Sequence, residues 1–218
     1  MRAFVGVAVA SLAFGGVAHA QAPRAPAGEN EKGYAEIVLQ SAFGNVTSQN
    51  FGAEVGVTVV KHVQLFAEVG KTRDVATTAL STAATIIAGA LAAVQPSAGY
   101  SVKEPVTFGA LGVRYLLPVA GKVQPYVLGG FGIANVTRDV KFTVGGSDVT
   151  ANMQQYGIVL GTDLTGDFTK PILVVGGGVS YPVWQRVVLD FQVRFGRILA
   201  DEDAIAVGRA GLGLGIRF

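Results

Sequence analysis

Apolar and polar side chains alternate along most of the chain from residue 34 onward. In the clearest segment, residues 186–198, Val187, Leu189 and Phe191 share one face, while Asp190 and Arg194 share the other. Successive side chains of a β-strand point to opposite faces, whereas a helix would scatter these residues around its axis. The segment therefore predicts a strand with one apolar face. Residues 204–218 repeat the pattern, with Leu and Ile alternating with Gly and Arg.

Eight such segments can be placed along the chain, separated by stretches of turn-forming residues. The connections after the second, fourth and sixth segments are short, whereas those after the third and fifth, residues 74–104 and 138–169, are long. Short turns on one side and longer loops on the other are typical of outer-membrane barrels. The pattern predicts an all-β fold, an eight-stranded antiparallel transmembrane up-and-down β-barrel with both termini on one side. The predicted strands are residues 34–43, 51–60, 64–73, 105–117, 124–137, 170–181, 186–198 and 204–218.

A water-soluble barrel or sandwich is the alternative, with its apolar faces turned inward. Composition favours the membrane, because only 15% of the residues are charged, against roughly 25% in an ordinary soluble domain. Half of the residues are hydrophobic, and 30 are Gly. Aromatic rings, which prefer the membrane interface, occur near the segment ends. They are Tyr115, Tyr181, Trp184 and Phe218 on the short-turn side, and Phe43 and Phe51 on the other.

The N-terminus has the features of a targeting segment. Arg2 precedes an apolar run over residues 3–17, and Ala18 and Ala20 supply the small residues of a cleavage site. An N-terminal membrane helix is the alternative, but the run is short. We expect a signal peptide over residues 1–20, a flexible periplasmic leader over residues 21–33 and a barrel over residues 34–218. The predicted location is the outer membrane of a bacterial cell.

The stretch from Val75 to Val102 contains no charged residue. It is long enough for a membrane-spanning helix, but a lone helix between two barrel strands has no topological place. An extended hairpin is a second alternative. We favour a helical extracellular loop, packed over the barrel mouth or folded inward as a plug.

Charged residues on the polar faces must line the interior, because on a lipid face each would cost about 2–4 kcal/mol near the midplane. Four acids and four bases are balanced there, and enclosed charges favour pairing. We favour a structural ion-pair network, with a gated polar path for ions or small solutes as the alternative. The predicted lumen residues are Glu36, Glu54, Glu68, Arg114, Asp190, Arg194, Arg209 and Arg217.

Glycine is also common on the inward faces. It can let strands coil sharply, accept a neighbouring ring against the backbone, or leave a cavity. We favour curvature and leave the cavity open. The inward glycines are Gly112, Gly130, Gly132, Gly176, Gly178, Gly211, Gly213 and Gly215.

The sequence gives little support to enzymatic, metal or nucleic-acid chemistry. It has no Cys, and beyond the predicted signal peptide its one histidine is His62, in a short turn on the periplasmic side. One His with scattered carboxylates predicts no metal site and no cofactor. The formal net charge is +2 without a basic cluster, so no nucleic-acid partner is expected.

Two stretches carry a resemblance to a known family. Residues 124–134 (QPYVLGGFGIA) and residues 212–218 (LGLGIRF) resemble the small outer-membrane barrels of the OmpA membrane domain, OmpX and OmpW type. The resemblance implies that Phe218 is part of the signal read by the barrel-assembly machinery, which would be a partner together with outer-membrane lipid. Since no residue follows Phe218 in the sequence, no peptidoglycan-binding domain is expected.

The resemblance also brings an enzymatic alternative into view, because some barrels of this size modify lipid A with a His and a Ser. His62 lies on the wrong side for such a site, so we expect no enzyme. The predicted function is a structural or surface-interaction role through the extracellular loops, with a ligand that the sequence does not name. The alternative is a narrow channel or a conduit for small or hydrophobic solutes.

Overall fold

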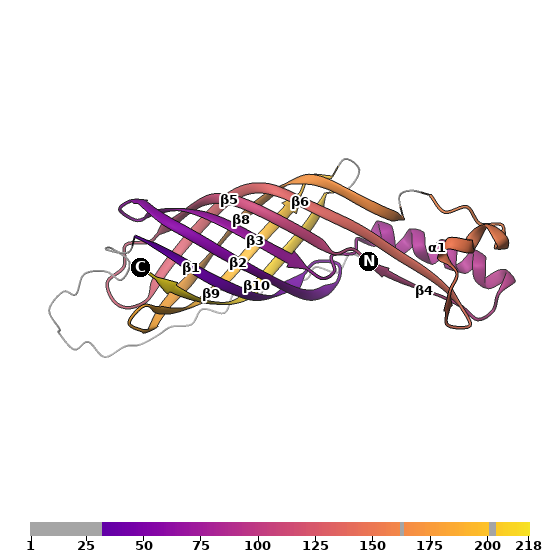
Figure 1. Ribbon diagram of the computed structural model, residues 1–218, viewed down its shortest axis with the longest axis horizontal. Coiled ribbons are helices and arrows are strands. Elements are labelled where there is room, and N and C mark those ends of the chain that lie inside the picture. Colours follow the sequence, from indigo (N-terminus) through magenta and orange to yellow (C-terminus); the bar gives the residue numbers. More distant parts are fainter. Residues whose placement is uncertain (1–31, 162–163, 201–203) are drawn as a thin grey trace, which may run out of the picture.

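The computed structural model describes residues 32–161, 164–200 and 204–218. The predicted signal peptide, and the predicted leader up to residue 31, lie outside the described residues. The described chain forms a closed barrel that carries a smaller unit at one end (Figure 1).

Eight of the described strands form the ring. Each pairs antiparallel with its neighbours, and the pairing of the first strand with the last, from Tyr34 opposite Arg217 to Phe43 opposite Gly208, closes it. The predicted eight-stranded antiparallel barrel is confirmed. The ring strands are β1 (Gly33–Phe43), β2 (Thr47–Val60), β3 (Val63–Thr72), β5 (Val106–Leu116), β6 (Gln124–Val144), β8 (Thr165–Trp184), β9 (Val187–Ile198) and β10 (Ile205–Arg217).

Two ring strands run well beyond the others. β6 continues to Val144 instead of ending near residue 137, and β8 begins at Thr165 instead of near residue 170. Their outer parts join the remaining elements in a unit that we call the extension, described over residues 74–104, 138–161 and 164–165. Its own elements are helix α1 (Thr78–Val94), strands β4 (Ala98–Lys103) and β7 (Ser147–Asp148), and the short 3-10 helix η1 (Thr150–Tyr156).

The charge-free segment forms a helix and a strand. The side chain of Thr77 accepts a hydrogen bond from the backbone N–H of Leu80 and caps the start of α1. Spacings of three and four residues gather the buried side of α1 on one face, where Leu80, Ala84, Ala88 and Leu91 lie. The expected helical loop is present, and a hairpin arm, β4, follows it.

The position of α1 corrects one of the expectations for this segment. The helix packs against β4 and against Val140 and Phe142 of β6, beyond the end of the barrel (Figure 1). It does not enter the lumen, so the plug alternative is wrong. Among the described residues, no helix combines the length and the apolar character needed to cross a membrane.

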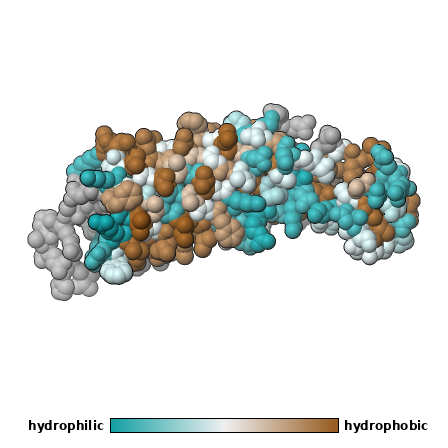
Figure 2. All heavy atoms as spheres, viewed as in Figure 1, coloured by the Kyte–Doolittle hydropathy of each residue, from teal (hydrophilic) through white to brown (hydrophobic). Residues whose placement is uncertain are grey.

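The barrel wall is apolar on its outside. Outward side chains such as Ile37, Val69, Phe131 and Leu214 are exposed, and they form a band with hydrophilic residues at both ends (Figure 2). The aromatic residues expected at the two rims are exposed as well. An apolar outer wall on a closed ring is the arrangement that a bilayer requires, since no strand edge meets lipid.

Candidate functional site

The inward faces of the ring place all eight predicted charged residues inside the barrel. Each is at most 8% exposed. They come from β1, β2, β3, β5, β9 and β10, where alternation along each strand turns every second side chain to the lumen. Their role as a network stays a prediction.

Arg194 lies at the centre of the lumen, and its side chain is fully buried. Its guanidinium is 2.6 Å from Glu54 and 2.9 Å from Glu68, with Glu36 at 3.9 Å. These carboxylates come from β1, β2 and β3, across the lumen from β9. One cation is therefore surrounded by three acids.

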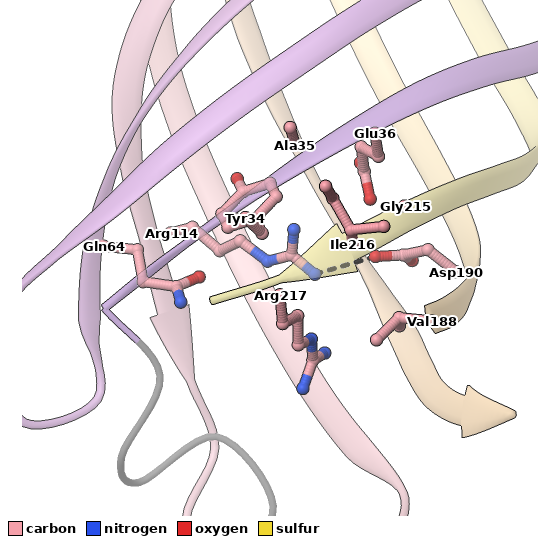
Figure 3. Close-up of a pocket in the computed structure, with 10 residues that line it drawn as sticks. All are labelled: Tyr34, Ala35, Glu36, Gln64, Arg114, Val188, Asp190, Gly215, Ile216 and Arg217. Atoms are coloured by element: carbon pink, nitrogen blue, oxygen red, sulfur yellow. Dashed lines mark hydrogen bonds and ion pairs between the residues drawn. The ribbon is translucent and has the colours of Figure 1, made fainter. Parts of the chain in front are cut away.

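Arg114 forms a second centre towards the end of the barrel where Gly33 and Phe218 lie. Its guanidinium is 2.7 Å from Asp190 (Figure 3). It is 3.6 Å from Glu54. The Cζ atom of this guanidinium lies over two rings. It is 3.4 Å from the ring centroid of Tyr126 and 4.7 Å from the ring centroid of Tyr34. Both hydroxyls donate to carboxylates, Tyr126 to Asp190 and Tyr34 to Glu54. The tyrosines thus hold the cation and its counter-ions in one geometry.

The two centres join into a continuous ladder. Glu54 contacts both Arg114 and Arg194, and Glu68 contacts both Arg194 and Arg209. Charges therefore alternate from Asp190, through two arginines and two glutamates, to Arg209. Arg217 lines a small cavity together with Glu36, Arg114 and Asp190 (Figure 3).

Buried amides and an apolar layer fill further parts of the lumen. Gln40 donates to Gln192, Asn50 donates to Gln40 and Thr72 donates to Asn50. Gln192 also donates to Glu36, which joins these amides to the charged residues. An apolar layer lies towards the extension, and Arg209 lines the small cavity beneath it. The buried side chains of this layer include Val75, Val106, Val136, Ile172, Val174, Ile198 and Ile205.

The lumen has little free space in the part of the chain that the structure describes. The cavity beside Arg114 and the one under Val75 and Ile198 each measure about 10 Å³. This is near the minimum that one water molecule occupies. Each of these two cavities is too small for an ion with its hydration shell.

Inward glycines make room for the aromatic rings of this network. A Cβ atom at Gly178 would lie about 2.5 Å from the hydroxyl of Tyr126, and one at Gly112 would meet the ring of Phe66 at 2.6 Å. Others, such as Gly176 and Gly211, lie against the backbone of the neighbouring strand. Ring acceptance and close strand approach therefore both account for inward glycines.

A second buried charge cluster lies where the extension meets the barrel. The carboxylate of Glu104 accepts from Arg138 Nε at 3.2 Å and from the backbone N–H of Thr77 at 3.2 Å. Asp74 accepts from the backbone N–H groups of Ala76 and Glu104. Burial raises the pKa of Glu104, while its hydrogen bonds and the charge of Arg138 oppose the shift. This cluster fixes the start of α1 to the outer part of β6.

Sequence reasoning missed the Asp74, Glu104 and Arg138 cluster. Asp74 and Glu104 stand on either side of the charge-free stretch, and Arg138 follows the expected end of the fifth strand. Their positions beside an uncharged segment were a usable signal, but the pairing depends on how far β6 continues.

Comparison with known proteins places this geometry in context. No protein-family model matches the chain, and no curated protein matches its sequence. Among solved structures, Neisserial surface protein A is similar over 85% of this chain and 96% of its own, with 15% identity and a TM-score of 0.54. A major outer membrane protein from Thermus thermophilus is similar over 85% of this chain and 99% of its own, with 11% identity and a TM-score of 0.52.

The fold is that of a small outer-membrane β-barrel. The resemblance to such barrels seen in the sequence is thereby confirmed. The outer membrane enzyme PagL is also similar, over 85% of this chain and 99% of its own, with 10% identity and a TM-score of 0.43. At these identities the similarity concerns the fold, and the role of this barrel has to be argued from its own residues.

Proposed function

We propose that this protein is a non-enzymatic, integral outer-membrane barrel that acts in surface interaction, with the extension as its contact surface. The observation that carries the proposal is that the barrel and the extension each have a packed interior of their own. The lumen is filled, whereas the extension projects from the barrel with a hydrophobic core of its own. A core built outside the membrane has no use in closing the barrel, and it holds a surface in a fixed shape.

The proposed orientation follows from the connections. The turn between β2 and β3 is Lys61–His62, and that between β8 and β9 is Gln185–Arg186. Tight turns of this kind lie on the periplasmic side of outer-membrane barrels. The extension lies at the opposite end of the barrel and therefore faces the outside of the cell (Figure 1).

The alternative, a narrow channel or solute conduit, has less support. A path for ions would have to pass the ladder from Asp190 to Arg209 and then the apolar layer, where cavities measure about 10 Å³. A non-enzymatic role is supported by His62, which lies in the β2–β3 turn, at the end of the barrel opposite the extension. Its ring packs edge-on against Tyr115, with 6.5 Å between centroids.

Trimming the extension tests the proposal. Residues 76–103 and 140–164 are replaced by short Gly/Ser turns, and the matched control replaces the β1–β2 turn, residues 44–46, which lies at the same end. Cells that make each variant are scored for retention on surfaces coated with collagen, with mucin or with a layer of the same cells. We expect the trimmed variant to lose retention and the control to keep it.

Planar-bilayer recording completes the experiment. We expect neither the full-length protein nor the trimmed variant to produce discrete conductance steps. Equal retention of trimmed and full-length protein on every surface, together with regular conductance steps, would favour the conduit.

A further inference from the structure

Strand β4 is the end of the sheet in the part of the chain that the structure describes. Its one neighbour is β6, with Ala98 opposite Val144 and Lys103 opposite Asp139. Within the barrel, the same edge of β6 pairs with β5, and β5 pairs in turn with β3. In the extension, β4 takes the place of β5, but no described strand pairs with its other edge. The second edge of β4 is therefore open.

The register shows which backbone groups reach that edge. Gly145 N donates to Ser97 O, and Thr137 N donates to Pro105 O. Hydrogen-bonded and non-hydrogen-bonded pairs alternate in an antiparallel ladder. Gly99, Ser101 and Lys103 therefore bond to β6, whereas the N–H and C=O groups of Tyr100 and Val102 point to the open edge.

The opposite edge of the extension is closed by its own residues. Beyond the end of β8, the backbone of Phe142 points away from β4. Its C=O accepts from the N–H of Val149 at 2.9 Å, and its N–H donates to the side chain of Thr150 at 2.9 Å. A strand edge is commonly protected by proline, by charge or by a bulge. β4 has no proline, and its one charged residue, Lys103, stands at its end.

We propose that the open edge of β4 binds an extended peptide segment of a partner protein, which adds to the sheet as a further strand. This rests on the proposed function, since it names how the extension makes contact. Main-chain hydrogen bonds to Tyr100 and Val102 supply the recognition of an extended backbone, and alternate side chains supply the selectivity.

The two faces of β4 define the chemistry of that peptide. Tyr100 lies on the α1 side, where its hydroxyl is 2.8 Å from that of Thr85, and it is 44% exposed. The segment from Val75 to Val102, which includes α1 and most of β4, contains no charged residue. The other side carries Lys103 and, on β6, Lys141, both exposed. A segment that alternates apolar with acidic side chains complements both faces.

A second copy of the chain fits this edge less well. Two copies in one membrane are related by rotation about the membrane normal, so strands that extend outward run in the same direction in both. Identical strand edges pair about a twofold axis in the antiparallel sense. The partner is therefore a different chain, and self-association is an outcome that the experiment must detect.

The test uses the full-length protein in detergent micelles and a labelled synthetic peptide of alternating Val and Glu, as long as β4. The control peptide has the same sequence with alternate amides N-methylated, which removes the N–H donors on one edge. Two variants isolate the backbone group: Tyr100→Pro removes the side chain and the outward N–H, and Tyr100→Ala removes the side chain alone. Fluorescence anisotropy measures binding, and limited proteolysis checks that the extension stays folded.

We expect the unmodified peptide to bind, and N-methylation to weaken binding by about tenfold, which is the scale of one or two hydrogen bonds. Tyr100→Pro should bind more weakly than Tyr100→Ala by a similar factor. Equal binding of both peptides to the wild-type protein, or no binding of either peptide, overturns the inference. This comparison uses the wild-type protein alone, so it does not depend on whether the variants fold. If the wild-type protein forms dimers and Tyr100→Pro abolishes them, the edge of β4 binds a second copy of the chain. That result also overturns the inference.

The outcomes separate this inference from the proposed function. If trimming the extension abolishes surface retention while Tyr100→Pro retains it, the contact role stands and the strand-edge mode is wrong. If trimming has no effect on retention, the proposed function itself fails, whatever the peptides do.

Discussion

The two parts of β6 pack their side chains in opposite ways. In the barrel, Val127, Phe131 and Ile133 point outward and are exposed, while Gln124 and Tyr126 point inward. From residue 135 onward the outward face is polar, and beyond Arg138 the inward face is apolar, with Val140, Phe142 and Val144. One strand therefore crosses from lipid to water, and the change in its pattern marks the boundary.

This inversion explains why the two regions are stabilised differently. The lumen encloses charges that must be paired, since an ion left alone in a dry interior is heavily penalised. The extension buries α1 against Val140 and Phe142, as a water-soluble domain does. Substitutions that break one region should therefore leave the other intact, and the following expectations are ways to test that independence.

The largest effect is expected at the centre of the charge ladder. Arg194→Glu places a further carboxylate beside Glu54 and Glu68, where the wild-type protein has their shared cation. Breaking a buried ion pair costs about 3–5 kcal/mol, and reversal should cost at least that. The measurement is the urea concentration at which the unboiled, fast-migrating band disappears from a gel.

Arg194→Met is the matched control for charge reversal. It leaves Glu54 with Arg114 and Glu68 with Arg209, so its loss of stability should be smaller. Adding Glu68→Arg to Arg194→Glu should recover a part of the loss only, because the new arginine also faces Arg209. Unchanged stability of Arg194→Glu with a clear shift in ion selectivity would instead favour a conducting lumen.

A slightly smaller effect is expected in the core of the extension. Leu91 is fully buried against this core, and Leu91→Ala should destabilise the extension by about 2–5 kcal/mol. Protease cleavage within the extension should accelerate, while the gel shift of the barrel stays the same. Ile86→Ala, on the exposed side of the same helix, should change neither, and an altered barrel transition in Leu91→Ala would contradict the independence of the two regions.

The link between the regions should show a smaller effect. Glu104→Ala removes the acceptor of Arg138 and of the Thr77 N–H, and a buried donor left without a partner costs about 1–3 kcal/mol. Hydrogen exchange of the backbone amides at the start of α1 should accelerate. Asp148→Ala, which removes an exposed acid from the same unit, serves as control. Equal exchange in both variants would show that Glu104 does not anchor the helix.

The sequence predicted the barrel better than the extension, for a physical reason. Lipid forces strict alternation on every membrane strand, so the inward position of Arg194 or Glu54 follows from parity alone. Beyond the membrane this constraint ends, although Val140, Lys141 and Phe142 still alternate. The predicted strand ends at residue 137 and residues 138–169 are predicted as a loop, whereas β6 continues to Val144.

The sequence predicts which residues belong to the charge ladder, but it does not predict which of them form ion pairs with each other. Parity places eight charged side chains in the lumen, but the pairing depends on strand tilt and on depth along the barrel. The stacking of Arg114 on Tyr126 also required a glycine opposite, Gly178, whose role no one-dimensional pattern reveals. The cluster at Glu104 needed the three-dimensional course of β6.

Phe218 should have the smallest effect on stability. Its ring is exposed at the rim, and its backbone bonds to Gly33 close the ring whatever side chain it carries. Phe218→Asp should therefore leave refolding into detergent nearly unchanged. In cells, the amount that reaches the outer membrane should fall, since the position resembles the family's assembly signal. Trp184→Ala, at the same rim and 72% exposed, is the control. If Phe218→Asp reaches the membrane at the level of Trp184→Ala, then the assembly role drawn from that resemblance is wrong for this chain.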